Sequence, residues 1–213
     1  MQPLQIAIVP VTPFQQNCSI LWCTKTMKAA IVDPGGDADR IRAAVAETGA
    51  QVEKILLTHG HLDHAGAAAE LSEHFGVPVE GPTAADQFLM DTLDKDWAAY
   101  GVEGARPVTP TRYLAEGETV RVGDLELDIL HVPGHTPGHL VYVYKPANLA
   151  LVGDTLFRGS VGRTDFAYGN SEQLITGIRE KLLPLGDSMV CLPGHGPLTS
   201  IGDERASNPF LQR

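Results

Sequence analysis

The sequence contains little cysteine, and its cysteines are poorly placed for pairing. Three occur among 213 residues. Cys18 and Cys23 fall in a predicted strand over residues 17–23, where an odd separation of five positions places them on opposite faces. A disulfide between them is disfavoured. Buried free thiols in a reducing compartment are favoured over a redox role for all three.

The chain is also poor in positive charge. Lysine and arginine total 16 against 26 aspartate and glutamate residues, a formal net charge of -10, and no cluster of basic residues stands out. A nucleic-acid surface would need a basic face, so we expect no nucleic-acid partner. Solubility is a sufficient explanation for the acidity itself.

A charged leader and long apolar runs are missing as well. Residues 1–14 contain no lysine or arginine and are interrupted by prolines, unlike a signal peptide. No apolar stretch approaches the length that crosses a bilayer. We therefore expect a cytoplasmic protein without a membrane partner.

The length and hydrophobic content of the chain are those of a folded globular domain. With 213 residues, 43% of them hydrophobic, the chain can bury a sizeable core, and we predict a single domain over residues 1–213. Apolar runs bounded by turn residues predict strands over residues 4–9, 19–22, 28–32, 52–57, 77–80, 118–122, 125–132, 140–144, 149–152 and 189–192.

Helical periodicity appears between several of these runs. Asp37 is the expected N-cap and Gly49 the expected end of one amphipathic helix, and residues 65–75 form another. Asn170, with Gln173 in the capping-box position, is expected to start a last helix.

Residues 81–116 carry one further helical pattern. One face of the predicted helix consists of Leu89, Leu93, Trp97 and Tyr100. Core packing is favoured over an active-site lid for this face. A solvated acidic face is expected from Asp86, Asp91, Asp94 and Asp96.

Residues 58–66, between a predicted buried strand and a predicted helix, contain the most closely spaced potential metal ligands of the sequence. Four potential metal ligands occur within six positions: His59, His61, Asp63 and His64. Side chains two apart in extended backbone point the same way, so His59 and His61 can converge on one cation. The turn into the helix redirects the other two toward a neighbouring point, so one loop can supply two metals. Imidazole and carboxylate suit zinc, iron or manganese.

The same placement recurs along the chain. His135, Asp154 and His195 each follow the end of a predicted apolar strand, in residues 134–136, 153–155 and 194–196. Ligands supplied from strand ends can meet at one edge of a sheet, where rigid elements hold loop residues in place.

Together, these four motifs resemble the metallo-β-lactamase superfamily, and within it the glyoxalase II (hydroxyacylglutathione hydrolase) branch. The resemblance extends over nearly the whole chain. It implies an α/β fold, an αββα four-layer sandwich in which two mixed β-sheets face each other with helices on the outer faces. It also implies a site at one sheet edge.

The resemblance further implies two divalent metal ions, with zinc as the first candidate and iron or manganese as alternatives. His59, His61 and His135 would bind one ion. Asp63, His64 and His195 would bind the other, and Asp154 would bridge the two. Each ion would keep an open position for water and substrate.

Residues 153–166 look like the branch that handles glutathione-linked thiols. Arg163 falls where that branch carries a basic residue for the glutathione moiety, and an ion pair with Asp165 is the equal alternative. The longer enzymes of the branch add a C-terminal helical extension, whereas only residues 197–213 follow the last motif here. The chain thus resembles the short bacterial type.

Other polar residues have more ordinary expected roles. His139 is favoured as a partner that orients His135 or Asp154, ahead of simple packing. His131 and His74 are expected to be structural. Asp33 is expected to form a turn, with a contact to the site as the minority option.

These features predict a hydrolase that cleaves a glutathione thioester of the S-lactoylglutathione type. Hydroxide held between the two metal ions would attack the thioester carbonyl, Asp154 would maintain the two-ion geometry, and Asp63 would orient the nucleophile or accept a proton. The alternative is a persulfide dioxygenase, which resembles the same fold and would use one iron on His59, His135 and Asp154. A metal-binding protein without catalytic activity is the third hypothesis.

Overall fold

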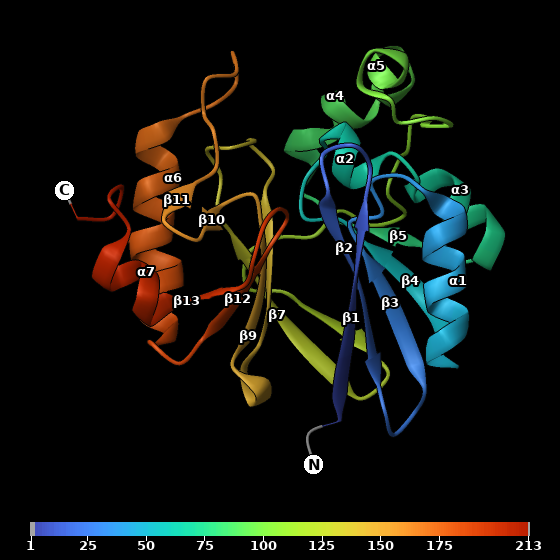
Figure 1. The fold of residues 1–213 in the computed structure, drawn as a ribbon, viewed down its shortest axis with the longest axis horizontal. Coiled ribbons are helices and arrows are strands. Elements are labelled where there is room, and N and C mark those ends of the chain that lie inside the picture. The colour runs from blue at the N-terminus through green and yellow to red at the C-terminus, as the bar shows by residue number, and fades with distance from the viewer. Residues whose placement is uncertain (1–2, 213) are drawn as a thin grey trace.

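The computed structural model describes residues 3–212, except for the side chains of residues 96–99. Two β-sheets lie face to face in the middle of the molecule, and helices cover the outer face of each sheet (Figure 1). The order of layers is therefore helix, sheet, sheet, helix. This arrangement confirms the predicted αββα sandwich.

The first sheet is built from the N-terminal part of the chain. Its strands, in spatial order, are β1 (Leu4–Val11), β2 (Gln16–Cys23), β3 (Lys28–Val32), β4 (Gln51–Leu56) and β5 (Val79–Glu80). The first three pair antiparallel, whereas β3, β4 and β5 pair in parallel. Parallel pairing needs a crossover connection, and the helices α1 (Ala38–Thr48) and α3 (Ala68–Phe75) supply it on the outer face.

The second sheet is built from the C-terminal part. Its strands, in spatial order, are β13 (Thr199–Ser200), β12 (Val190–Pro193), β9 (Leu149–Gly153), β8 (Leu140–Tyr144), β7 (Leu125–His131) and β6 (Thr119–Val122). Strands β9 and β12 are parallel and the other pairs are antiparallel. The helices α6 (Ser171–Gly177) and α7 (Ile201–Ser207) cover its outer face at the left of Figure 1.

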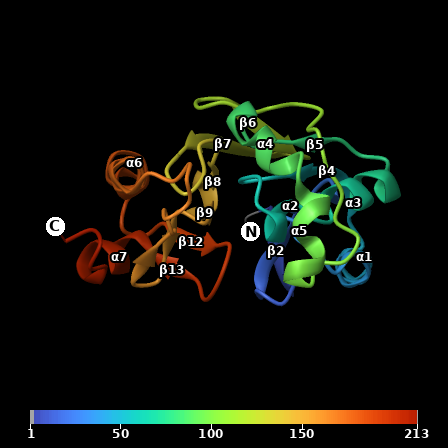
Figure 2. The same cartoon turned by 90° about the horizontal axis from the view of Figure 1, so that it is seen from above.

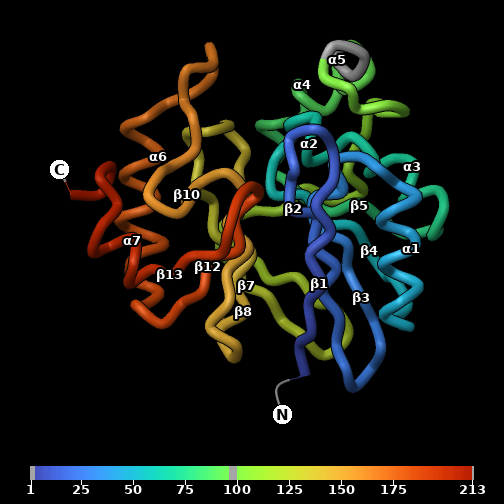
Figure 3. The backbone as a smooth tube through the Cα atoms, in the orientation of Figure 1, coloured from blue at the N-terminus to red at the C-terminus, as the bar shows by residue number. Residues whose placement is uncertain are grey.

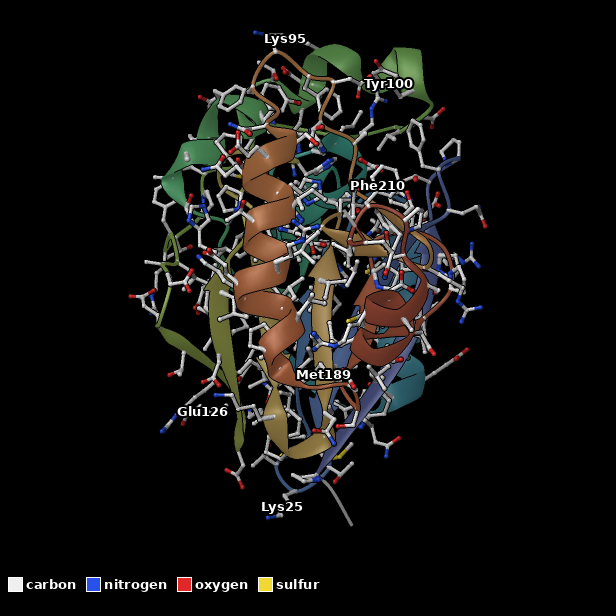
Figure 4. All side chains as sticks on the ribbon, turned by 90° about the vertical axis from the view of Figure 1, so that its left-hand side faces the viewer. Lys25, Lys95, Tyr100, Glu126, Met189 and Phe210 are labelled. Carbon is white, nitrogen blue, oxygen red and sulfur yellow. The ribbon has the colours of Figure 1, made fainter. Side chains whose placement is uncertain are left out.

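Short elements gather at one end of the sandwich. They are α2 (Leu62–Ala65), α4 (Gln87–Met90), α5 (Leu93–Tyr100), β10 (Leu156–Phe157) and β11 (Ser160–Val161). Seen from above, α4 and α5 lie nearest the viewer, over the half of the molecule that contains the first sheet (Figure 2). Figure 4 places Tyr100 at this upper end, opposite Lys25 and Glu126 at the lower end.

Three hydrophobic cores hold the four layers together. One lies between the first sheet and its helices, one between the two sheets, and one between the second sheet and its helices. Cys18 belongs to the first core and Cys23 to the second, so the prediction of opposite faces is confirmed. All three cysteines are buried and free, as predicted. Within residues 3–212, none of the helices has the length and apolar character needed to traverse a bilayer.

Several local predictions need correction. Asp37 occupies the N-cap position of α1 as predicted, but its side chain forms no capping bond: its backbone is left-handed (φ 49°), and its carboxylate accepts a hydrogen bond from the Thr12 amide at 2.8 Å instead. The predicted helix over residues 65–75 is divided at Gly66 and Ala67, where the Ala67 amide bonds to the Pro34 carbonyl. Asn170 does cap α6, accepting from the Gln173 amide at 3.0 Å.

The helix predicted within residues 81–116, with Leu89, Leu93, Trp97 and Tyr100 on one face, is also not one continuous helix. Two short helices, α4 and α5, replace it. Leu93 is buried as predicted, but Tyr100 is 53% exposed, so the packing interpretation is wrong for that residue. Asp91 and Asp94 are exposed as expected. The side chains of Asp96 and Trp97 lie outside the described part of the structure.

Candidate metal centre

The four motifs meet at the upper edge of the two sheets. The loop after β4 carries His59 to His64, and the loops after β7, β9 and β12 carry His135, Asp154 and His195. The red loop after β12 runs beside the blue start of β2 in Figure 3, and the Asn17 amide bonds to the Gly194 carbonyl at 2.7 Å. A Cβ at Gly194 would lie 2.2 Å from Asp154 Oδ1, so only glycine permits this approach.

One group of side chains consists of three histidines. The Nε2 atoms of His59 and His135 each lie 3.0 Å from Nδ1 of His61. Three nitrogens this close crowd their lone pairs together unless a cation lies between them. Metal–nitrogen bonds of about 2.0–2.1 Å in tetrahedral geometry place ligand nitrogens about 3.3–3.4 Å apart, which is close to the observed spacing.

A second group consists of Asp63, His64 and His195. Nε2 of His195 lies 3.1 Å from Asp63 Oδ2 and 3.4 Å from Nε2 of His64. His64 Nε2 lies 3.9 Å from the same Asp63 oxygen. Both groups satisfy the distance and donor requirements of a metal-binding cluster.

Asp154 lies between the two groups. Its Oδ1 is 3.3 Å from His64 Nε2, and its Oδ2 is 3.6 Å from Nε2 of both His135 and His195. The carboxylate is buried, and within residues 3–212 no donor forms a hydrogen bond with Oδ1. A buried carboxylate oxygen without a donor is costly unless a cation neutralises it, so the donor set fits a pair of metal ions.

Each of these histidines has one ring nitrogen that faces the centre (inward) and one that faces away from it (outward). Hydrogen bonds to the outward nitrogens fix the orientation of the rings. Nδ1 of His135 bonds to the Arg163 carbonyl at 2.8 Å, and Nδ1 of His195 bonds to the Phe14 carbonyl at 3.2 Å. A carbonyl only accepts, so each Nδ1 carries a proton and each Nε2 is directed at the centre. The Tyr168 hydroxyl lies 2.8 Å from Nε2 of His61 and occupies its outward nitrogen.

Asp33 performs the same function for one histidine of each group, so its assignment as a simple turn residue is wrong. Its carboxylate contacts Nδ1 of His64 at 3.0 Å and accepts from the Thr58 hydroxyl at 2.6 Å. The Thr58 oxygen in turn lies 3.0 Å from Nδ1 of His59. A single buried carboxylate therefore orients His64 directly and His59 through Thr58.

Asp86 is buried, so its assignment to a solvated face is wrong. Its carboxylate accepts from the Gly60 amide at 3.0 Å, the Thr136 hydroxyl at 2.7 Å and the Gly138 amide at 2.6 Å. These bonds join the loop that carries His59 and His61 to the turn that carries His135. Burial raises the pKa of Asp86 against the effect of these three donors.

Three further histidines, His139, His131 and His74, lie outside the two groups. His139 accepts a hydrogen bond from the Asp154 amide at 3.0 Å and stacks on His59 with ring centroids 4.7 Å apart, so it orients Asp154 as predicted. His131 bonds to the Pro137 carbonyl at 2.9 Å and supports the turn before His139. His74 is exposed, and its ring packs edge to face against that of Phe75.

The two groups differ in their charge. Burial lowers the pKa of His59 and His135, and burial together with the neighbouring His135 lowers that of His61 to about 3, so this group is neutral. Burial opposes charge at His64 too, but the carboxylates of Asp154 and Asp63 outweigh it and raise the pKa.

Both carboxylates in the centre are ionised. Burial acts to raise the pKa of Asp154 and of Asp63, but His64 and the other nearby histidines outweigh it and lower both values. At His195 burial is again opposed, here by the hydrogen bond to Asp63, which raises the pKa. Negative charge therefore concentrates where a second cation would lie.

A cavity of about 770 Å³ opens onto this centre. Much of its wall is apolar or aromatic, from Phe14, Leu62, Leu89, Leu93, Tyr100, Phe157, Val161, Phe166 and Tyr168. Arg163 also lines it, so it lies where a substrate would pass. Its guanidinium forms a two-point ion pair with Asp165 at 2.8 and 2.9 Å and lies 4.6 Å from the Phe166 ring centroid. Both predicted roles of Arg163 are thus compatible with its position.

Comparisons with known proteins agree with this geometry. A hydroxyacylglutathione hydrolase, GloC, of Haemophilus influenzae is 46% identical over 209 residues, covering 98% of each chain. The crystal structure of TTHA1623 in a di-iron-bound form matches with a TM-score of 0.85 and 35% identity, covering 96% of this chain and all of that one. The BLEG-1 B3 metallo-beta-lactamase matches with a TM-score of 0.88 and 32% identity, over 98% and 100%. Residues 11–195 match the metallo-beta-lactamase superfamily, and the chain belongs to that family as a metal-dependent hydrolase.

Proposed function

We propose that this protein is a binuclear metal-dependent hydrolase that cleaves a glutathione thioester of the S-lactoylglutathione type. The observation that carries the proposal is the pair of three-residue groups with the Asp154 carboxylate between them. The similarity to a relative named hydroxyacylglutathione hydrolase supports the choice of substrate class. The substrate is thus a small molecule linked to glutathione.

The proposed ligand assignment follows the two groups. His59, His61 and His135 hold one divalent ion; Asp63, His64 and His195 hold the other, and Asp154 contributes to both. Zinc is the first candidate, with iron and manganese as alternatives, because imidazole and carboxylate suit all three. Two such ions would supply a hydroxide nucleophile at neutral pH and a Lewis acid for the carbonyl oxygen.

The side chains of the centre then have distinct tasks. Asp154 maintains the spacing of the two groups, held by its own amide bond to His139. Asp63 directs Oδ2 toward His195 and is positioned to orient the nucleophile or to accept its proton. The outward hydrogen bonds of the histidines occupy their outward nitrogens and fix the ring orientation, so that a metal ion would take the inward nitrogens in place of a proton.

A thioester suits this site better than an amide. A thiol has a pKa of about 8.5, so the thiolate departs without a general acid, whereas an amine leaving group must be protonated. Asp63 and Asp154 are the carboxylates that line the cavity, and both belong to the proposed ligand set. The apolar wall excludes water from the remainder of the substrate.

We also propose a cytoplasmic location. The three cysteines are free, which fits a reducing compartment.

The test is incubation of the zinc-loaded protein with S-lactoylglutathione, with thioester loss followed over time and metal content measured by elemental analysis. We expect turnover with two ions per chain. Oxygen uptake with glutathione persulfide by a protein holding one iron would instead support the dioxygenase. Lack of turnover on either substrate by fully loaded protein would reject both enzymes and leave a metal-binding module.

A further inference from the structure

The hairpin of β10 and β11 forms one wall of the cavity and carries a second arginine. Phe157, Arg158, Ser160 and Val161 all line the cavity. Among the side chains that the structure describes, Arg158 forms no ion pair, whereas Arg163 is neutralised by Asp165. The structure shows one hydrogen bond from the exposed Arg158 guanidinium, from Nη2 to the Leu198 carbonyl. A guanidinium has five N–H donors, so Arg158 retains donors for a ligand.

The C-terminal segment holds this arginine in position. Three consecutive hairpin residues bond to it: Arg158 donates to Leu198, the Gly159 amide donates to Glu204 at 2.8 Å, and the Ser160 carbonyl accepts from Asn208 at 2.9 Å. Glu204 is only 1% exposed and Asn208 is fully buried. A hairpin whose three successive residues bond to a backbone carbonyl and to two buried side chains has a defined position, which reduces the entropy lost when a ligand binds.

Arg158 and Arg163 adjoin different groups of the metal centre. The ring of Phe157 lies 6.4 Å from that of His195, which belongs to the group with Asp63 and His64. Arg163, by contrast, bonds through its carbonyl to His135 in the other group. The Arg158 guanidinium contacts the carbonyl of Leu198, three residues after His195, whereas the backbone of Arg163 contacts His135, so the two arginines belong to segments that adjoin different groups of the centre.

We propose that Arg158 binds a carboxylate of the thiol part of the substrate and that it sets the preference for anionic thioesters. This inference rests on the proposed function. The protein has a formal charge of -10, so an anionic substrate needs a local cation. Arginine binds carboxylates through paired N–H groups, and none of the carboxylates that the structure describes forms an ion pair with Arg158. Leu198, Glu204 and Asn208 position this cation through their contacts with residues 158–160.

The test uses S-hexylglutathione, a thioether that has both carboxylates of glutathione but no thioester bond, together with its diethyl ester. Affinities are measured by calorimetry on zinc-loaded wild type, Arg158→Gln, Arg158→Lys and Arg163→Gln. Arg121→Gln is the matched control, because Arg121 is an exposed arginine paired with Glu126 at the opposite end of the molecule (Figure 4). Metal content and circular dichroism establish that each variant is loaded and folded.

We expect Arg158→Gln to weaken binding of S-hexylglutathione on the order of tenfold, since one charge-assisted contact is lost. Binding of the diethyl ester should not change, Arg158→Lys should retain most of the affinity, and Arg163→Gln should have the smaller effect. Equal affinities of wild type and Arg158→Gln, an equal loss for the ester, or no binding by wild type would each overturn the inference. If the wild type bound S-hexylglutathione with this dependence on Arg158 but hydrolysed no thioester, the proposed function would be rejected and the carboxylate-binding role of Arg158 would stand.

Discussion

Replacement of Asp86 tests how the two histidine-bearing loops are held together. Asp86→Asn keeps the size of the side chain but removes its charge and places an amide N–H₂ where one oxygen was. Oδ2 accepts two hydrogen bonds and Oδ1 accepts one. The carbonyl oxygen of asparagine can replace Oδ2, but the new N–H₂ then faces the Gly138 amide, donor against donor.

The expected loss follows from these contacts. A hydrogen bond to a charged group contributes about 1.5–3 kcal/mol, and a buried donor left without an acceptor costs about 1–3 kcal/mol. The burial that raises the pKa of Asp86 is a penalty that asparagine avoids, so it offsets part of the loss. We expect Asp86→Asn to lower the free energy of unfolding by about 2–3 kcal/mol, and Asp86→Ala, which removes all three acceptors, by about 4–6 kcal/mol.

Urea unfolding of the metal-free protein measures this difference without the contribution of bound metal. Asp91→Asn is the control, because Asp91 is exposed on the same segment and should change stability by at most about 0.5 kcal/mol. The zinc affinity of Asp86→Asn should also fall, since Gly60 and Thr136 adjoin His59, His61 and His135. If Asp86→Asn were as stable as Asp91→Asn, Asp86 would not join the two loops as inferred.

Three further predictions concern pH, the bridging carboxylate and a helix cap. Burial lowers the pKa of His59, His61 (to about 3), His135 and His139, so the native metal-free protein does not bind protons that the unfolded chain binds below a pKa of about 6.5. The raised pKa values of His64 and His195 act in the opposite sense and offset about two of these four groups. The stability of the metal-free protein is therefore retained above a pH of about 6.5 and should fall by about 3 kcal/mol between pH values of about 7.5 and 5.5, as urea unfolding at each pH would measure; a flat profile would contradict neutral histidines. Asp154→Ala should lower metal occupancy and nearly abolish turnover, and normal activity in this variant would rule out the bridging role. Asn170→Ala should lower the free energy of unfolding by about 1 kcal/mol through loss of the bond to the Gln173 amide, and unchanged thermal unfolding would show that the cap is dispensable.

Features governed by local pattern were predictable from the sequence. The period of two along a strand correctly separated Cys18 from Cys23, and the capping-box spacing correctly located Asn170. The position of His135, Asp154 and His195 after strand ends was enough to predict that they converge with His59. Strand ends at one sheet edge leave little freedom in where such side chains lie.

Features that depend on tertiary contacts were not predictable in this way. Asp86 resembles its exposed neighbour Asp91 in sequence, and only the approach of Gly60 and Gly138 distinguishes it. Asp33 has the pattern of a turn residue, and its contact with His64 arises from two loops 31 positions apart. The contact of Arg158 with the Leu198 carbonyl likewise joins segments with no pattern in common.

The number of zinc ions bound per chain tests the central claim most directly. Elemental analysis after dialysis against zinc, followed by removal of free metal, should give two ions for the wild type and one for His195→Ala, because the group of His59, His61 and His135 remains complete. A wild-type value of one or zero would contradict a binuclear centre built from these seven side chains.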